Sequence, residues 1–321
     1  MRIHINMRRL LQAGLALSFM CFILGCGAAS HADKSEIVTV AAANASNPTI
    51  ALDKQAETAY VAWIETGEAR PVYLARMNKG EAQFSAPVQA NDKAGDAAAH
   101  SEAPAQAAVG PEGNVYVLWH NEIPLEGRRF PASNLRFVRS VDGGKTFSPA
   151  IYVNDDYHGP PTSHGFHSIA VSPDSTIYVC WLDGRDRAVA PEVRVARSRD
   201  GGQSFEPGVV VAQKICPCCR TAMTVDVDGV LYLAFRHAPP DNIRNMFMAR
   251  SEDRGKTFST PTQIHNDGWV IDGCPHNGPA LDTDAAGNVH VVWYTGKEQG
   301  YGVYYAISKD RGDTFSSRRC I

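Results

Sequence analysis

The chain has 321 residues, a formal net charge of −3 at pH 7 and a hydrophobic content of 44%. This composition is typical of a globular protein, and the length suffices for one large domain or two small ones. The near-neutral charge gives no electrostatic basis for binding nucleic acid, so that class of partner is excluded. We expect a monomer.

The first 25 residues are predicted to be an export signal. Three arginines precede an apolar stretch at residues 10–24, which is shorter than the roughly 20 residues that a transmembrane helix needs. The stretch ends in Gly25-Cys26, which resembles a bacterial lipobox and predicts lipid attachment at Cys26. Ordinary cleavage after Ala32 is the alternative. Because Gly27 and not Asp follows the cysteine, we expect a lipid anchor in the outer membrane of the bacterial cell envelope, on the periplasmic or surface side.

A short tether at residues 26–46 leads into the main domain and includes one strand at residues 36–41. Residues 47–321 then repeat one plan of four short strands, with the second strand of each unit ending in an aromatic residue. These aromatics, which lie 54 to 62 residues apart, are Trp63, Trp119, Trp181, Phe235 and Trp293. Short strands at a regular period predict an all-β protein, specifically a β-propeller of four-stranded blades.

The connection between the third and fourth strands carries the pattern Ser-x-Asp-x-Gly-x-Thr/Ser-Phe. Clear copies occupy residues 140–147, 198–205, 251–258 and 308–315, and a degenerate copy occupies residues 77–84. The Asp carboxylate can accept backbone N–H groups across a turn, and Gly tolerates a positive φ. The hydroxyl can close the loop locally, and Phe then begins the next strand. We therefore predict a tight structural turn without a catalytic role.

This pattern resembles the Asp-box, or bacterial neuraminidase (BNR) repeat, of the sialidase superfamily. The resemblance implies a six-bladed propeller that binds glycans, whereas five units can be read here. The fifth unit shows no convincing fourth strand after Phe315. Either residues 36–41 supply that strand and close a five-bladed ring, or the chain is a truncated six-bladed propeller. The second alternative is favoured.

Enzymes of that superfamily bind the substrate carboxylate with three arginines and use a tyrosine nucleophile. Their first-blade Arg-Ile-Pro motif is absent here. Arg220 and Arg236 are candidates for later members of the arginine triad, and Tyr294 is a candidate tyrosine. We therefore predict glycan or small-molecule binding at the cell envelope, with an active exo-alpha-sialidase, a glycoside hydrolase, as an alternative.

Three arginines follow the aromatic end of a second strand and are predicted to bind the ligand: Arg185, Arg236 and Arg244. An aromatic face beside a guanidinium suits sugars and carboxylates. The alternative is local ion pairing, of Asp183 with Arg185 and of Asp241 with Arg244.

Cysteines and histidines concentrate in the loops that enter the innermost strands of units three to five. The candidates for a metal or disulfide site are His164, His167, Cys216, Cys218, Cys219, Cys274 and His276. An exported protein can oxidise its thiols, so a disulfide from Cys218 or Cys219 to Cys274 is one interpretation. Thiolate and imidazole also suit zinc or copper, which makes a metal- or thiol-redox protein a second alternative function. Binding of an organic ligand, or plain packing, is the third interpretation.

Overall fold

The computed structural model describes residues 2–3, 38–40, 44–53, 55–185 and 191–321. The predicted signal peptide and Cys26 lie outside these residues, apart from a two-residue strand, β1 (Arg2–Ile3), that pairs with β2 (Val38–Thr39). In the described part of the chain, no helix has the length and hydropathy needed to cross a membrane.

The described residues form five four-stranded antiparallel sheets, each built from consecutive strands. The first contains β3 (Ala45–Asp53), β4 (Thr58–Glu65), β5 (Val72–Asn78) and β6 (Val88–Gln89). The second contains β7 (Gln106–Val109), β8 (Val115–His120), β9 (Leu135–Ser140) and β10 (Ile151–Tyr152). The third contains β11 (His164–Val171), β12 (Ile177–Asp183), β13 (Glu192–Ser198) and β14 (Val209–Gln213). The fourth contains β15 (Ala222–Val225), β16 (Leu231–Arg236), β17 (Met246–Ser251) and β18 (Thr262–His265), and the fifth β19 (Ala280–Thr283), β20 (Val289–Thr295), β21 (Gly302–Ser308) and β22 (Arg319–Cys320).

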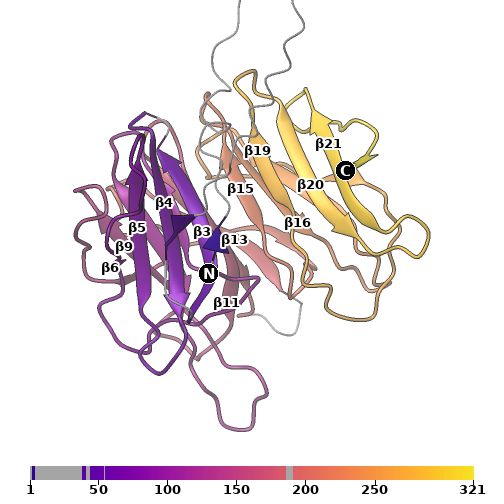
Figure 1. The fold of residues 1–321 in the computed structure, drawn as a ribbon. Coiled ribbons are helices and arrows are strands. Elements are labelled where there is room, and N and C mark those ends of the chain that lie inside the picture. The colour runs from indigo at the N-terminus through magenta and orange to yellow at the C-terminus, as the bar shows by residue number, and fades with distance from the viewer. Residues whose placement is uncertain (1, 4–37, 41–43, 54, 186–190) are drawn as a thin grey trace, which may run out of the picture.

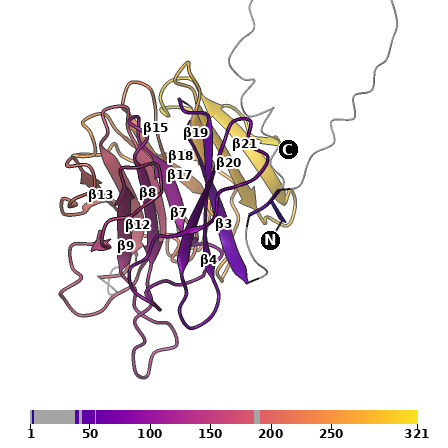
Figure 2. The same cartoon turned by 60° about the vertical axis from the view of Figure 1, so that its left-hand side comes forward.

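The first strands of the sheets lie innermost and contact one another in the series β3, β7, β11, β15 and β19. Figure 1 shows the sheets following one another in chain order, and Figure 2 shows the same series after rotation. The first and fifth sheets stand at the two ends of the series. This radial arrangement confirms the predicted all-β propeller, with five blades in the described residues.

One expectation about the fifth blade is wrong. A fourth strand does follow Phe315, because β22 pairs with β21 through Tyr304 opposite Cys320. Of the segment named in the less favoured alternative, Val38 and Thr39 pair with β1 and not with the fifth sheet. The two-residue strand β22 has no alternating pattern to read, and the Arg318 guanidinium lies 4.0 Å from the centroid of the Tyr304 ring. Cation–π contact of this kind helps to hold so short a strand.

The hydrophobic core lies between neighbouring blades. In β8, Val115, Val117 and Trp119 pack toward the first sheet, whereas Tyr116 and Leu118 pack toward the third. Both faces of β8 are therefore covered, which explains why this strand is hydrophobic almost throughout instead of alternating with polar residues.

The four clear repeat loops, residues 140–147, 198–205, 251–258 and 308–315, are tight turns as predicted. In the first, the Asp142 carboxylate accepts the Lys145 and Thr146 amides, both at 3.0 Å, and the Thr146 hydroxyl at 2.6 Å. Gly144 has a φ of 82°, and a Cβ there would lie 2.7 Å from Leu74 Cδ2 in the preceding blade. Glycine is therefore required both by the backbone and by the close packing of two blades.

In three of the four repeat loops, an arginine at the end of the third strand of the preceding blade donates to a carbonyl of the loop. Arg139 donates to the Gly201 carbonyl at 3.3 Å, Arg197 to the Arg254 carbonyl at 2.6 Å, and Arg250 to the Arg311 carbonyl at 3.1 Å. The loops therefore hold neighbouring blades together, at the end of the propeller opposite to the loops that enter the first strands.

We expect Asp200→Ala to lower the free energy of unfolding by about 1–2 kcal/mol, because the turn loses a carboxylate with several donors. Asp200 accepts the Gln203 amide at 2.9 Å, the Ser204 amide at 3.1 Å and the Ser198 hydroxyl at 2.7 Å. Urea unfolding measures the change, with Glu126→Ala, another exposed carboxylate, as the control. Equal stability of the two variants would contradict the structural role of the turn.

Candidate functional site

The loops that enter the first strands and those that join the second and third strands share one end of the propeller, here called the mouth. The pairing of His164, at the start of β11, with Asp183, at the end of β12, shows this for the third blade. All the predicted Cys and His candidates lie in or beside entry loops. The chain order of the strands therefore places them at the mouth, away from the repeat loops.

Three cysteines of the fourth entry loop bring their sulfurs together below the surface. Cys216, Cys218 and Cys219 are 0%, 5% and 1% exposed. Cys216 Sγ lies 3.7 Å from Cys218 Sγ and 3.4 Å from Cys219 Sγ. The Cys216 amide donates to the Arg236 carbonyl at 2.9 Å, which fixes the loop to the end of β16. We call these three residues the buried thiol group.

The fifth entry loop brings two more candidates to Cys218. The Sγ atoms of Cys218 and Cys274 and a ring nitrogen of His276 lie within 4.8 Å of one another, with Cys274 and His276 exposed. A Cβ on Gly278 would lie 2.3 Å from the Arg220 carbonyl oxygen, so the two loops touch backbone to backbone. We call Cys218, Cys274 and His276 the outer group.

The sulfurs are free of disulfides in the structure, as are Cys180 and Cys320. The contacts with Cys218 and then Cys219 hold the pKa of Cys216 well below that of an ordinary thiol. The same contact with Cys216 raises the pKa of Cys219. Cys180 is buried in β12, and burial raises its pKa to about 12.

Arg236 lies fully buried beside the thiols and joins the fourth blade to the fifth. Its guanidinium donates to the carbonyls of Arg244 at 2.9 Å, Asn277 at 3.0 Å and Tyr294 at 2.7 Å. Burial lowers its pKa. A side chain with no exposed surface cannot reach a ligand at the mouth in this conformation, so its contacts favour a structural role over ligand binding or catalysis.

The other arginine and tyrosine candidates differ in accessibility. Arg244 is 7% exposed and donates to Asn242 Oδ1 at 3.1 Å, and the predicted pair with Asp241 is not formed. The Tyr294 ring packs edge-on against Trp269. Arg220 keeps 40% of its side chain exposed and pairs with Glu102 of the second blade at 3.1 Å. Of these residues, Arg220 is the guanidinium that an incoming ligand could reach.

Entry loops from the second, third and fifth blades approach one another at the mouth. The His100 ring lies 5.6 Å from the Phe166 ring and 6.1 Å from the His276 ring, measured between centroids. His100 belongs to the second entry loop and His276 to the fifth. Together with the Arg220–Glu102 ion pair, these contacts place the outer group at the centre of the mouth.

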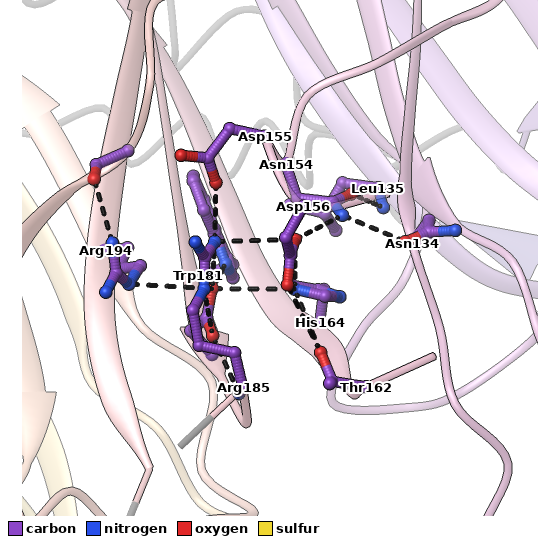
Figure 3. A network of polar contacts seen from close by, with 12 residues as sticks. Asn134, Leu135, Asn154, Asp155, Asp156, Thr162, His164, Trp181, Arg185 and Arg194 are labelled. Carbon is purple, nitrogen blue, oxygen red and sulfur yellow. Dashed lines mark hydrogen bonds and ion pairs between the residues drawn. The ribbon is translucent and has the colours of Figure 1, made fainter. Parts of the chain in front are cut away.

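His164 does not join the cysteines but belongs to a polar network in the third blade (Figure 3). Its Nε2 lies 3.0 Å from Asp156 and 3.5 Å from Asp183, and its Nδ1 lies 2.6 Å from the Ser133 carbonyl oxygen. Burial would raise the pKa of Asp156, but hydrogen bonds, first from His164, lower it on balance.

Arg185 closes this network and is not free for a ligand. It lies 2.9 Å from Asp183 and 2.6 Å from Asp155, so the alternative of local pairing with Asp183 is the arrangement observed. Asp156, His164 and Asp183 are close enough to share a cation, but the Arg185 guanidinium already lies against both carboxylates. No sequence motif marks Asp156, which follows an equally acidic Asp155 in a polar loop.

His167 is also separate from the cysteines and lies against His120 at the end of β8, a histidine that no sequence motif marks. Its ring lies 5.8 Å from that of His120, and its Nε2 bonds the Pro104 carbonyl at 2.9 Å. Burial lowers the pKa of His120 to about 4 and that of His167 to about 3. The predicted seven-residue set therefore divides: the five residues of the fourth and fifth loops come together, and His164 and His167 lie apart.

Comparison with solved structures identifies the architecture. A Dyadobacter fermentans protein of unknown function matches with a TM-score of 0.59 and 13% identity over 87% of this chain and 83% of that one. An intramolecular trans-sialidase from Ruminococcus gnavus, in complex with oseltamivir carboxylate, matches with a TM-score of 0.56 and 12% identity over 85% of this chain and 83% of that one. The chain has a sialidase-like β-propeller fold.

The same fold recurs in longer enzymes. A sialidase from Streptococcus pneumoniae matches with a TM-score of 0.57 and 10% identity over 86% of this chain, which spans 61% of that protein. No family model and no curated protein matches the sequence. At these identities the likeness establishes the fold alone, so function must be argued from the residues at the mouth.

Proposed function

We propose that this sialidase-like propeller binds a thiophilic metal ion, Cu(I) or Zn(II), at its mouth. The observation that carries the proposal is the buried thiol group, Cys216, Cys218 and Cys219, with three unbridged sulfurs within 4.8 Å of one another. Thiolates are the ligands that select these ions. Three buried thiols without a partner would also be exposed to oxidation in an exported protein.

The sulfur spacing suits coordination. Two thiolates on one tetrahedral ion, at a bond length of about 2.3 Å, stand about 3.8 Å apart. The observed separations from Cys216 Sγ are 3.7 Å and 3.4 Å, whereas a disulfide needs about 2.05 Å. When bound, the ion would offset part of the negative charge of the three thiolates. The hydrogen bond from the Cys216 amide to the Arg236 carbonyl holds the loop in place, and the adjacent Pro217 restricts its backbone.

Further assignments from the sequence complete the proposal. We assign residues 1–25 to a lipoprotein signal peptide and Cys26 to the lipid anchor, which would place the metal site at the bacterial cell envelope. We also assign the repeat loops to the Asp-box type, on their sequence pattern and turn geometry. The metal would then be met outside the cytoplasm.

Metal retention by the reduced full-length protein tests the proposal. We expect the wild-type chain, loaded anaerobically with Cu(I) or Zn(II) and desalted, to retain at least one ion, and Cys216→Ser to retain one ion fewer. Elemental analysis with thiol counting measures both, and Cys320→Ser, an exposed cysteine of β22, is the control.

Two outcomes would contradict metal binding. Identical retention by the wild-type chain and by Cys216→Ser would exclude the buried thiol group as the site. A wild-type chain that retains no metal but forms a disulfide from Cys216, Cys218 or Cys219, detected by mass spectrometry, would favour the thiol-redox or structural disulfide alternatives.

Glycan binding is a second candidate, supported by the fold and by the exposed Arg220 at the mouth. Arginine recognises carboxylates of the kind that sialosides carry. Arg236 and Arg244 are buried, so an accessible arginine triad is not formed by these residues, and binding without hydrolysis is the form that the geometry favours. Sialoside binding that weakens in Arg220→Gln supports this candidate, and turnover of a fluorogenic sialoside would support the exo-alpha-sialidase alternative.

A further inference from the structure

We infer that the mouth binds two Cu(I) ions that share the Cys218 thiolate. The buried thiol group supplies three sulfurs to one ion, and the outer group supplies the sulfurs of Cys218 and Cys274 and a nitrogen of His276 to the other. This inference rests on the proposed function and specifies its metal and stoichiometry. Cys218 is the residue that belongs to both groups.

The distances between ligand atoms indicate that the two groups bind separate ions. Two ligand atoms on the same ion can be no further apart than twice the bond length, about 4.6 Å for a bond of about 2.3 Å. The ligand atoms of each group lie within 4.8 Å of one another, which is close to this limit, whereas the five residues together do not form one such group. A thiolate sulfur has lone pairs for more than one ion, so Cys218 can bridge.

The number and kind of donors in each group favour Cu(I) over Zn(II). Each group offers three soft donors, and Cu(I) readily takes three thiolate or imidazole ligands. Structural zinc takes four protein ligands in a tetrahedron. Two zinc ions with five residues, one of them shared, would leave both coordination spheres short of protein ligands.

The charge of the four thiolates also favours Cu(I) over Zn(II). Cys216, Cys218, Cys219 and Cys274 as thiolates carry four negative charges, of which two Cu(I) ions neutralise two. The buried guanidinium groups of Arg236 and Arg244 lie close to these sulfurs and offset the remaining negative charge. Two Zn(II) ions would bring two more positive charges to the same two buried guanidinium groups, which is less favourable.

The two sites differ in access. Cys274 and His276 are exposed, whereas the three sulfurs of the buried thiol group are at most 5% exposed. The outer ion therefore meets solvent and external chelators directly, and the inner ion is reached past Cys218. We expect a hydrophilic Cu(I) chelator to remove the outer ion first and the inner ion more slowly.

An anaerobic Cu(I) titration of the reduced full-length protein, against a chromogenic Cu(I) chelator, tests the inference. We expect two ions per wild-type chain, removed in two kinetic phases. Cys274→Ser combined with His276→Ala should bind one ion and lose the fast phase. Cys216→Ser combined with Cys219→Ser should bind one ion and lose the slow phase. The control, Cys320→Ser combined with His158→Ala, also removes one exposed cysteine and one exposed histidine, and it should bind two ions.

The outcomes separate this inference from the proposed function. One ion in the wild-type chain and one in the outer double variant would overturn the pair and leave the buried site standing. One ion that is lost in either double variant would mean a single ion bound by both loops, which also overturns the pair. No ion in the reduced wild-type chain would overturn both proposals. Circular dichroism of each variant confirms that the β-sheet fold is retained.

Discussion

Arg236→Met is expected to lower the free energy of unfolding by about 3–5 kcal/mol, the range found when one partner of a buried charged network is removed. Methionine keeps much of the volume but donates nothing to the carbonyls of Arg244, Asn277 and Tyr294, which now receive hydrogen bonds from the guanidinium. Each buried acceptor left without a donor costs about 1–3 kcal/mol. Urea unfolding followed by tryptophan fluorescence measures the change.

The substitution should also loosen the fifth entry loop, because the Asn277 carbonyl loses its hydrogen bond from Arg236. Asn277 directly follows His276, which belongs to the outer group. Metal retention at the outer group is therefore expected to weaken more than retention at the buried thiol group. Arg199→Met is the matched control: its side chain is 59% exposed and pairs with Glu206, so its stability should change by less than about 0.5 kcal/mol. A similarly small change for Arg236→Met would show that the three hydrogen bonds contribute little.

The repetition in the sequence made the fold predictable. The aromatic ends of the second strands and the Ser-x-Asp-x-Gly pattern recur in register, so each blade could be located without knowledge of its neighbours. The short last strand β22 was missed because two residues carry no periodicity. Residues in β8 are buried on both faces, so their burial follows from blade packing and not from an alternating pattern.

The site was predictable only where adjacent entry loops meet. Cys216 to Cys219 and Cys274 occupy equivalent places in neighbouring blades, and the structure brings their loops into contact. His164 and His167 occupy comparable places in the third blade, but the rings bond Asp156 and the Pro104 carbonyl instead. Side-chain direction at the top of a strand depends on such local partners, which a sequence pattern does not reveal.

The same applies to the arginines. Their position after an aromatic residue suggested a ligand-binding surface, yet Arg236 is buried beneath the loops and Arg185 lies in an ion-pair network with Asp155 and Asp183. Only the three-dimensional course of the fifth entry loop decides that Arg236 meets backbone carbonyls and not solvent.

Stability is expected to rise with pH between about pH 4 and pH 6.5 because of the buried pair His120 and His167. Burial lowers the pKa of His120 to about 4; the charge of Glu122 raises this pKa slightly and that of His100 lowers it slightly. Burial lowers the pKa of His167 to about 3. The unfolded chain protonates both near the ordinary value of about 6.5. In this range the unfolded state therefore binds more protons than the folded state, and acid favours unfolding.

Each histidine can contribute up to about 1.4 kcal/mol per pH unit in that range. His120→Asn and His167→Gln remove one titrating group each, so each variant should show a smaller slope of unfolding free energy against pH, even if its stability at pH 7 is lower. Urea unfolding of reduced, metal-free protein from pH 4.5 to 7.5 measures the slope, and His158→Gln, an exposed histidine, should leave it unchanged. The repeat-loop carboxylates do not interfere, because the depressed pKa of a group such as Asp200, about 2, gives a stability change only below about pH 4. A slope that stays the same in both buried-histidine variants would mean that these rings do not resist protonation in the folded protein.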